Sequence, residues 1–305
     1  MAQTRMKCEP PRKHSTTEKK SVAEPASFRK FLVILIMHLC KKVLLINTVA
    51  KLGIYLCGAS VVSLFTDLVP VPKSYFSEKT NFFNTFFVKL GWGWTISLLL
   101  PFVYYTSSTY CCGQKTLVRQ HMARLGIATF FWYSCTTIFN WVENVTGMCT
   151  SAEMEHDRKN LCIEAGYEWI GFDASGHTFL LMYSLLVISE EVKCISGWSK
   201  IADAIKTEEE HPTRLTAEQL TTLKFLYGCN TPKIKGLIVC LTLLQILWEV
   251  MFFATVIYFH NMPQKLIAAA FASAVWLFTY QTWYRIEKIW PLPPGKGLIR
   301  YMVPP

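Results

Sequence analysis

Two histidines, His177 and His260, each lie where an apolar segment of the sequence meets a polar loop. Imidazole is the side chain best suited to act as a nucleophile or a proton donor near neutral pH. Two predicted membrane crossings separate the two residues, so both should lie on the same face of a bilayer. The sequence therefore predicts an active site at one edge of a membrane.

The residues just before His177 could help it to handle an anionic substrate. Ser175 and Gly176 precede it directly, and a glycine permits a tight turn whose backbone amides bind anionic oxygens. Asp173 lies one helical turn earlier and could orient or ligate His177. If the following helix begins near Ile170, His177 lies about two turns, roughly 10 Å, along it. A polar group at that depth must face a cavity or a partner.

Other kinds of site fit these residues less well. A lone histidine at a membrane boundary is commonly an interfacial residue without a catalytic role. This is the alternative interpretation of His177 and of His260 when each is considered singly. A metal site would need further ligands, and the chain has no HxH, HxxxH or HExxH spacing, so neither a metal nor a cofactor is expected. A serine hydrolase would need a Gly-x-Ser-x-Gly elbow, which is absent. Three further histidines are expected to be solvated or interfacial: His38, His121 and His211.

The composition is that of a polytopic membrane protein. Hydrophobic residues make up 51% and aromatic residues 14% of the 305 residues. A spanning helix needs about 20 largely apolar residues. The segments that qualify are 43–66, 82–106, 125–142, 172–189, 236–259 and 266–284. We therefore expect an all-α fold with six transmembrane helices in a membrane domain over residues 43–284.

The flanking segments are predicted to lie outside the hydrocarbon. Residues 1–27 are polar and charged, which predicts a disordered tail that lacks the apolar region of a signal peptide. Residues 28–42 have basic ends around an apolar middle, which predicts an interfacial helix. A solvated cytosolic insertion is expected over 190–235, and an extended, proline-containing cytosolic tail over 285–305.

The net charge of +10 is a topology signal rather than a sign of nucleic-acid binding. The terminal segments and loops assigned to one face, among them 1–42 and 190–235, hold 24 Lys and Arg. The loops of the opposite face, 67–81, 143–176 and 261–265, hold five. Because cytosolic loops are enriched in Lys and Arg, both termini should be cytosolic and both histidines lumenal.

The cysteines agree with this topology. Of eleven cysteines, only Cys149 and Cys162 fall in a predicted lumenal loop. An oxidising lumen favours a disulfide between them, with two free thiols as the alternative.

Several strings of the sequence resemble the fat storage-inducing transmembrane family. They are Pro72-Lys73-Ser74-Tyr75, Asn84-Thr85-Phe86-Phe87-Val88-Lys89, Trp94-Thr95, Leu99-Leu100-Pro101-Phe102, Gly171 to Leu181, Tyr258-Phe259-His260-Asn261, Gln264-Lys265, Thr279-Tyr280 and Trp283-Tyr284. They occur in family order over most of the membrane domain. The resemblance implies an endoplasmic-reticulum protein with six membrane helices, cytosolic termini and a role in lipid droplet formation and lipid balance.

The family is similar in turn to the lipid phosphate phosphatases, in which a Ser-Gly-His motif supplies a general acid and a later histidine is the phosphorylated nucleophile. The implied activity is cleavage of fatty acyl-CoA to acyl phosphopantetheine and adenosine 3′,5′-bisphosphate. By this resemblance His260 would attack phosphorus and His177 would protonate the leaving oxygen. The chain departs from the phosphatases where Gln264 replaces an aspartate and Ala254 an arginine. The partner of the nucleophile and the phosphate clamp stay open, with Lys89 as a candidate clamp.

A non-catalytic alternative is a protein that binds and partitions neutral lipid, with the histidines as polar anchors. The expected ligands are accordingly fatty acyl-CoA and neutral lipid. The catalytic interpretation requires both imidazoles to reach one cavity, about one phosphoryl group apart.

Overall fold

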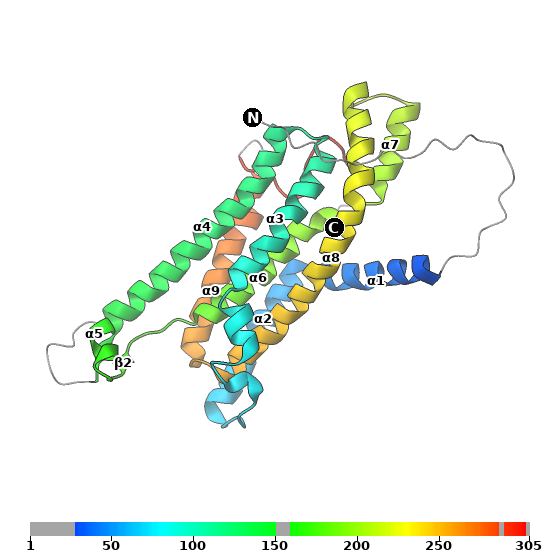
Figure 1. The fold of residues 1–305 in the computed structure, drawn as a ribbon. Coiled ribbons are helices and arrows are strands. Elements are labelled where there is room, and N and C mark those ends of the chain that lie inside the picture. Colours follow the sequence, from blue (N-terminus) through cyan, green and yellow to red (C-terminus); the bar gives the residue numbers. More distant parts are fainter. Residues whose placement is uncertain (1–27, 151–158, 287–289, 303–305) are drawn as a thin grey trace.

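The computed structural model describes residues 28–150, 159–286 and 290–302, and these are mostly helical (Figure 1). The expected tail over residues 1–27 lies outside the described residues. The helices are α1 (Phe28–Leu44), α2 (Thr48–Leu68), α3 (Gly91–Tyr110), α4 (Lys115–Thr146), α5 (Lys159–Glu164), α6 (Gly176–Glu191), α7 (Lys200–Glu210), α8 (Ala217–Tyr258) and α9 (Met262–Trp276). A π-helical turn over Phe83–Val88 precedes α3, and shorter turns continue α9 to Arg285. Two short strands, β1 (Met148–Cys149) and β2 (Trp169–Ile170), pair antiparallel.

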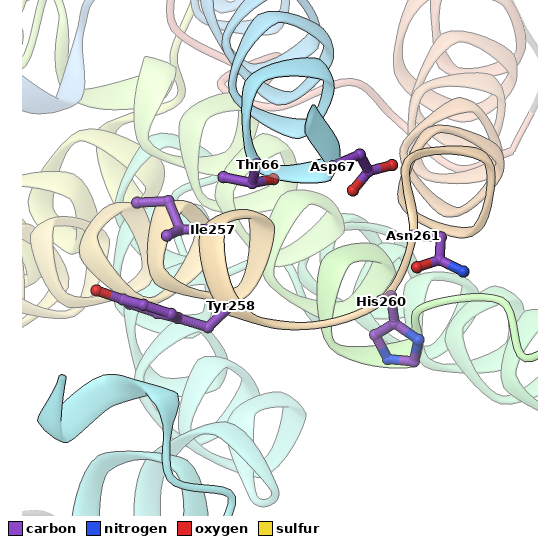
Figure 2. Close-up of a pocket in the computed structure, with 6 residues that line it drawn as sticks. All are labelled: Thr66, Asp67, Ile257, Tyr258, His260 and Asn261. Atoms are coloured by element: carbon purple, nitrogen blue, oxygen red, sulfur yellow. The ribbon is translucent and has the colours of Figure 1, made fainter. Parts of the chain in front are cut away.

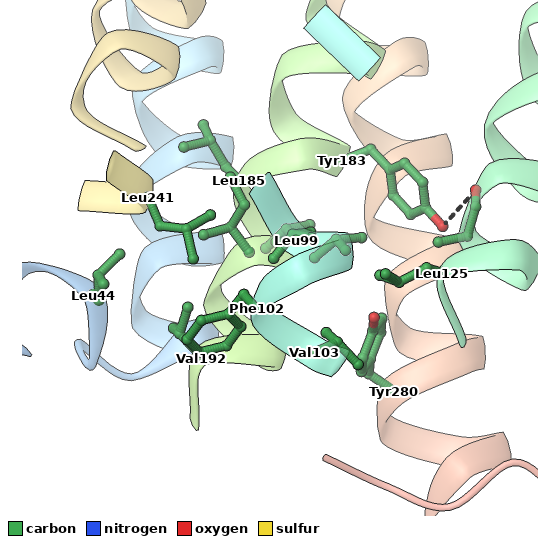
Figure 3. Packing of buried hydrophobic residues seen from close by; sticks show 14 of the residues in the cluster. Leu44, Leu99, Phe102, Val103, Leu125, Tyr183, Leu185, Val192, Leu241 and Tyr280 are labelled. Carbon is green, nitrogen blue, oxygen red and sulfur yellow. Dashed lines mark hydrogen bonds between the residues drawn. The ribbon is translucent and has the colours of Figure 1, made fainter. Parts of the chain in front are cut away.

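The helix α6 lies at the centre of the bundle. Every residue from Thr178 to Glu191 is buried, and α2, α3, α4, α8 and α9 all pack against it. A helix that is apolar on all sides is stable only when neighbours surround it in this way. Figure 3 shows Tyr183 and Leu185 of α6 inside this core, where the Tyr183 hydroxyl donates to the Ala128 carbonyl at 3.3 Å.

Among the described residues, three helices are long and apolar enough to cross a membrane. They are α2, α8 and the helix from Met262 to Arg285, and they coincide with the predicted spans 43–66, 236–259 and 266–284. The chain is thus an all-α membrane protein. The other predicted spans coincide with α3, α4 and α6, of which α6 has only 16 residues and rises about 24 Å.

The predicted insertion over 190–235 is largely helical rather than a loop. The helix α7 packs against α8, and Ile201, Ile205 and Leu223 of this pair are buried. Residues 217–235 continue without a break into the predicted span, so α8 is one helix of 42 residues. Its length of about 63 Å is twice the hydrocarbon thickness, and one half must therefore extend beyond the membrane.

The C-terminal segment is folded back on the bundle, which differs from the extended tail expected over 285–305. The N–H of Leu298 donates to the Tyr110 carbonyl at 3.1 Å, and the ring of Tyr301 stacks on that of Tyr110. Ile299 and Tyr301 are buried. The tail therefore forms part of the core at this end of α3 and α4.

A buried ion pair lies beneath the folded-back tail. Arg124 contacts both carboxylate oxygens of Glu191, at 2.8 and 2.6 Å, and donates to the Leu292 carbonyl of the tail. His121 donates from Nε2 to the Lys296 carbonyl at 3.0 Å. The expectation that His121 is solvated is wrong, because the tail covers it completely.

The helix α1 runs crosswise to the bundle and packs against α8 (Figure 1). Its residues from Phe28 to Ile36 are exposed, although most of them are apolar. An apolar helix with basic ends in this orientation fits the membrane interface predicted for 28–42.

Candidate active site

His260 lies in the short connection between α8 and α9. Its backbone φ is 60°, a left-handed conformation that is unfavourable for a residue with a Cβ. The side chain is 20% exposed and borders a pocket of about 470 Å³ (Figure 2). The lining residues are Thr66, Asp67, Ile257, Tyr258, His260 and Asn261. Surrounding contacts must hold this connection in place, since its backbone conformation is not favourable by itself.

Two contacts from neighbouring helices hold the connection. Asp67, at the end of α2, accepts the Met262 N–H at 2.9 Å. Lys265 is buried in the first turn of α9, where its ammonium donates to the Val256 carbonyl of α8 at 2.9 Å. The ammonium also lies 3.9 Å from Asp67. Figure 2 shows Asp67 of α2 beside the connection that carries His260 and Asn261.

Gln264, which replaces the aspartate of the phosphatases, caps α9. Its side-chain oxygen accepts the Asn261 N–H at 3.1 Å, and its backbone carbonyl accepts the Ser175 N–H at 3.2 Å. This second bond joins the start of α9 to the start of α6. Gln264 thus fixes the two helix ends that carry the candidate histidines.

Asp173 supplies the carboxylate that faces His260. Its Oδ2 lies 3.7 Å from Nδ1 of His260, although the sequence suggested His177 as its partner. Asp173 lies in the loop before α6, where partial burial raises the pKa of its carboxyl group, and the nearby His260 charge opposes that rise. The carboxylate that faces His260 therefore comes from the loop before α6 and not from the start of α9.

His177 lies in the first turn of α6. The helix begins at Gly176, so the expectation of a start near Ile170, with His177 two turns along, is wrong. The Ser175 hydroxyl accepts the Thr178 N–H at 3.3 Å and caps the helix. Gly176 is not among the left-handed residues, so this turn does not depend on the conformational freedom of glycine.

The two histidines and Lys89 lie near one another. The charges of His260 and Lys89 both act on the half-buried ring of His177. Lys89 lies in the two-residue turn between the π-helical turn and α3, rather than inside a continuous helix over 82–106. Ala254, at the arginine position of the phosphatases, is a buried residue of α8. Among the described residues, Lys89 is therefore the lysine whose charge acts on His177, although neither of the two lines the pocket that His260 borders.

A disulfide closes the loop that leads to Asp173. Cys149 and Cys162 are bonded to each other, and β1 pairs with β2 beside this link. The indole of Trp169 in β2 donates to the Glu143 carbonyl of α4 at 3.2 Å. These contacts attach the loop to the end of α4.

The described ranges of the chain contain no group of three or more His, Cys, Asp or Glu side chains placed to hold a metal ion. Two positioning residues, Asp67 and Lys265, were not singled out by their chemistry in the sequence. Lys265 lies in one of the family strings, and Asp67 directly follows the first predicted span. Their role depends on a contact between α2 and α9 that no local pattern reveals.

Comparisons with known proteins agree with the resemblance. The family described as Fat storage-inducing transmembrane protein matches residues 72–280. A Drosophila melanogaster protein named acyl-coenzyme A diphosphatase FITM2 is 40% identical over 294 residues, covering 92% of this chain and 69% of the relative. Proteins of the same name from Xenopus laevis and Homo sapiens are 37% and 36% identical, covering 79% and 76% of this chain and 85% and 81% of the relatives. No solved structure matches the chain.

Proposed function

Because the chain belongs to the fat storage-inducing transmembrane family, we propose that it is a fatty acyl-CoA diphosphatase of the endoplasmic-reticulum membrane. The names of its relatives support the substrate and the reaction. The observation that carries the proposal is the 3.7 Å approach of the Asp173 carboxylate to His260, with His260 and Lys89 close enough to His177 for their charges to act on its ring. Together they offer a nucleophile, a proton donor and a cation, which are the groups that phosphoryl transfer needs.

In the first step His260 attacks one phosphorus of the diphosphate. With Nδ1 facing the Asp173 carboxylate, the lone pair of Nε2 forms the nitrogen–phosphorus bond. The bond from phosphorus to the bridging oxygen breaks, and its electron pair goes to that oxygen. His177 gives its proton to the same oxygen, so one product leaves and a phosphohistidine remains.

In the second step water attacks the phosphohistidine. His177, now neutral, takes a proton from the water, and the phosphorus–nitrogen bond breaks with its electron pair returning to His260. Acyl phosphopantetheine and adenosine 3′,5′-bisphosphate are then both released. The balance is one water consumed for each acyl-CoA cleaved, and Lys89 offsets the charge on the phosphoryl oxygens throughout.

Purified protein with acyl-CoA tests this assignment. His260→Ala should abolish turnover with any leaving group, because no phosphoenzyme forms. His177→Ala should lower the turnover rate with acyl-CoA about 10²–10⁴-fold, which is the usual contribution of general acid catalysis. A substrate with a nitrophenolate leaving group needs no proton and should restore much of that loss. Equal defects of the two variants with both substrates would contradict the separate roles.

The same assay bears on neutral lipid. A protein that only binds and partitions neutral lipid shows no turnover, and its histidine variants behave like the wild type. Phosphoenzyme trapped on the wild type and missing from His260→Ala would exclude that alternative.

We further propose six membrane crossings with cytosolic termini and a lumenal active site. The crosswise α1 and the long α8 support this, since α1 joins the start of α2 and the first half of α8 extends away from the bundle beside α7, whereas His260 follows the other end of α8. Tags at both termini should be digested by protease added to sealed microsomes. Protection of either tag would contradict the topology.

A further inference from the structure

The crosswise helix α1 and the long helix α8 enclose a second pocket, far from the histidines. Its volume is about 590 Å³. The lining residues are Arg29, Lys30, Val33 and Ile34 of α1 and Lys235 of α8. Three cationic side chains and an apolar floor, formed by the surface of two aliphatic side chains, thus line the pocket.

Among the described residues, no acidic side chain pairs with the cations of this pocket. No ion pair involves Arg29, Lys30 or Lys235 in the described part of the chain. The helix α1 has no acidic residue, and neither do the residues of α8 near Lys235. The pocket therefore presents uncompensated positive charge, which an anionic ligand would neutralise.

The position of the pocket along the bundle fits the edge of a membrane. Lys235 precedes the end of α8 at Tyr258 by 23 residues, about 35 Å of helix. This is slightly more than the ~30 Å hydrocarbon core. The pocket should therefore lie at headgroup level on the face opposite His260. A crosswise helix with exposed apolar side chains belongs at the same level.

From these observations we propose that the pocket binds the headgroup of an anionic glycerophospholipid. The phosphate and its acidic headgroup would lie among Arg29, Lys30 and Lys235, and an acyl chain would pass over Val33 and Ile34. A soluble phosphate compound would leave this apolar floor uncovered. The site is independent of the acyl-CoA chemistry, because its Lys235 lies 23 residues along α8 from the end that leads to His260.

Native mass spectrometry of the full chain tests the site. The protein is released from phosphatidylcholine nanodiscs that contain phosphatidylserine, and the lipid that stays bound is identified. A cation near the surface contributes about fivefold to the affinity for anionic lipid. The double variant Arg29→Gln/Lys235→Gln should therefore retain phosphatidylserine at least roughly tenfold less. Lys41→Gln/Lys42→Gln, which removes the same charge from the other end of α1, is the matched control and should retain it.

Two further measurements complete the test. Ile34→Glu should also release phosphatidylserine, because it places an acid in the pocket, and added salt should release it from the unaltered protein. The proposal is overturned if phosphatidylcholine is retained equally well, or if the control variant loses as much phosphatidylserine. Displacement of phosphatidylserine by a non-hydrolysable acyl-CoA would likewise overturn it, by assigning the pocket to the substrate.

Discussion

His260 holds its imidazole on a left-handed backbone, with the Asp173 carboxylate on the Nδ1 side of the ring. A carboxylate in that place favours the tautomer with the proton on Nδ1 and stabilises the ring when it becomes positive. Sequence inspection found both residues but paired Asp173 with His177, four positions away. The observed pair joins the loop before α6 to the connection after α8, and only tertiary packing sets such a contact.

Removing the charge of Asp173 should therefore impair the nucleophile. Asp173→Asn keeps the shape of the side chain, and we expect kcat to fall at least about 10²-fold. Asp173→Glu should keep more activity, because it keeps the charge. An Asn variant that forms phosphohistidine at the normal rate would contradict this role.

The pH profile gives an independent readout of the same residue. Burial raises the Asp173 pKa above its ordinary 3.8, so kcat/KM of the wild type should fall as the pH drops through that raised value and the carboxylate becomes neutral. Asp173→Asn should change this acid limb, because it removes the contribution of the carboxylate. The measurement is kcat/KM against pH for both proteins, and an unchanged limb in the variant would assign the titration to another group.

The positions of the helices that carry the site were predicted better than the residues at which these helices begin and end. Apolar segments of about 20 residues located the helices, because burial against neighbours or lipid requires that composition. The start of α6 was predicted wrongly, because the residues before Gly176 are apolar enough to continue a helix. In the structure the helix begins after Ser175, which caps it. The first half of α8 was predicted to belong to a solvated insertion, and its packing against α7 was not foreseen because its surface is largely polar.

The N-terminal caps of α6 and α8 allow a matched test of whether the cap of α6 positions His177. Ser175→Ala removes the hydroxyl that accepts the Thr178 N–H, and Thr216→Ala removes the one that accepts the Gln219 N–H. Each loss costs about 1 kcal/mol of stability and should lower the melting temperature by a few degrees. Activity at low temperature should fall only for Ser175→Ala, because Thr216 lies at the far end of α8. Equal activity of the two variants would show that the cap does not position His177.

The whole molecule has a polar centre at each end, and the sequence predicted only the one with His177 and His260. The other, around Arg124 and Glu191, is completed by backbone carbonyls of the C-terminal tail. Carbonyl groups carry no sequence signal, and the proline-containing tail was therefore predicted to be extended, without these contacts. His121 is buried in this centre as a consequence.

The burial of His121 should make stability depend on pH. Desolvation and the Arg124 charge lower its pKa from 6.5 to about 3, against the effect of the bond to the Lys296 carbonyl. The unfolded chain then binds a proton that the folded chain excludes. The contribution of neutral, buried His121 to the stability of the fold is complete above about pH 6.5 and is lost progressively as the pH falls toward 3. Melting temperatures of the wild type should drop more steeply between pH 7 and pH 5 than those of His121→Asn, and parallel curves would contradict the assignment.

The disulfide between Cys149 and Cys162 has a consequence for the time at which each molecule becomes catalytically active. Asp173 follows β2, the strand beside this bond, by only three residues. A newly inserted chain carries two thiols there, and disulfide formation takes seconds to hours. We expect newly synthesised molecules to be inactive as long as these two cysteines are reduced, and to become active when the disulfide forms. Catalytic output would then depend on the age of the protein population and on the oxidant supply of the compartment, as well as on the amount of protein.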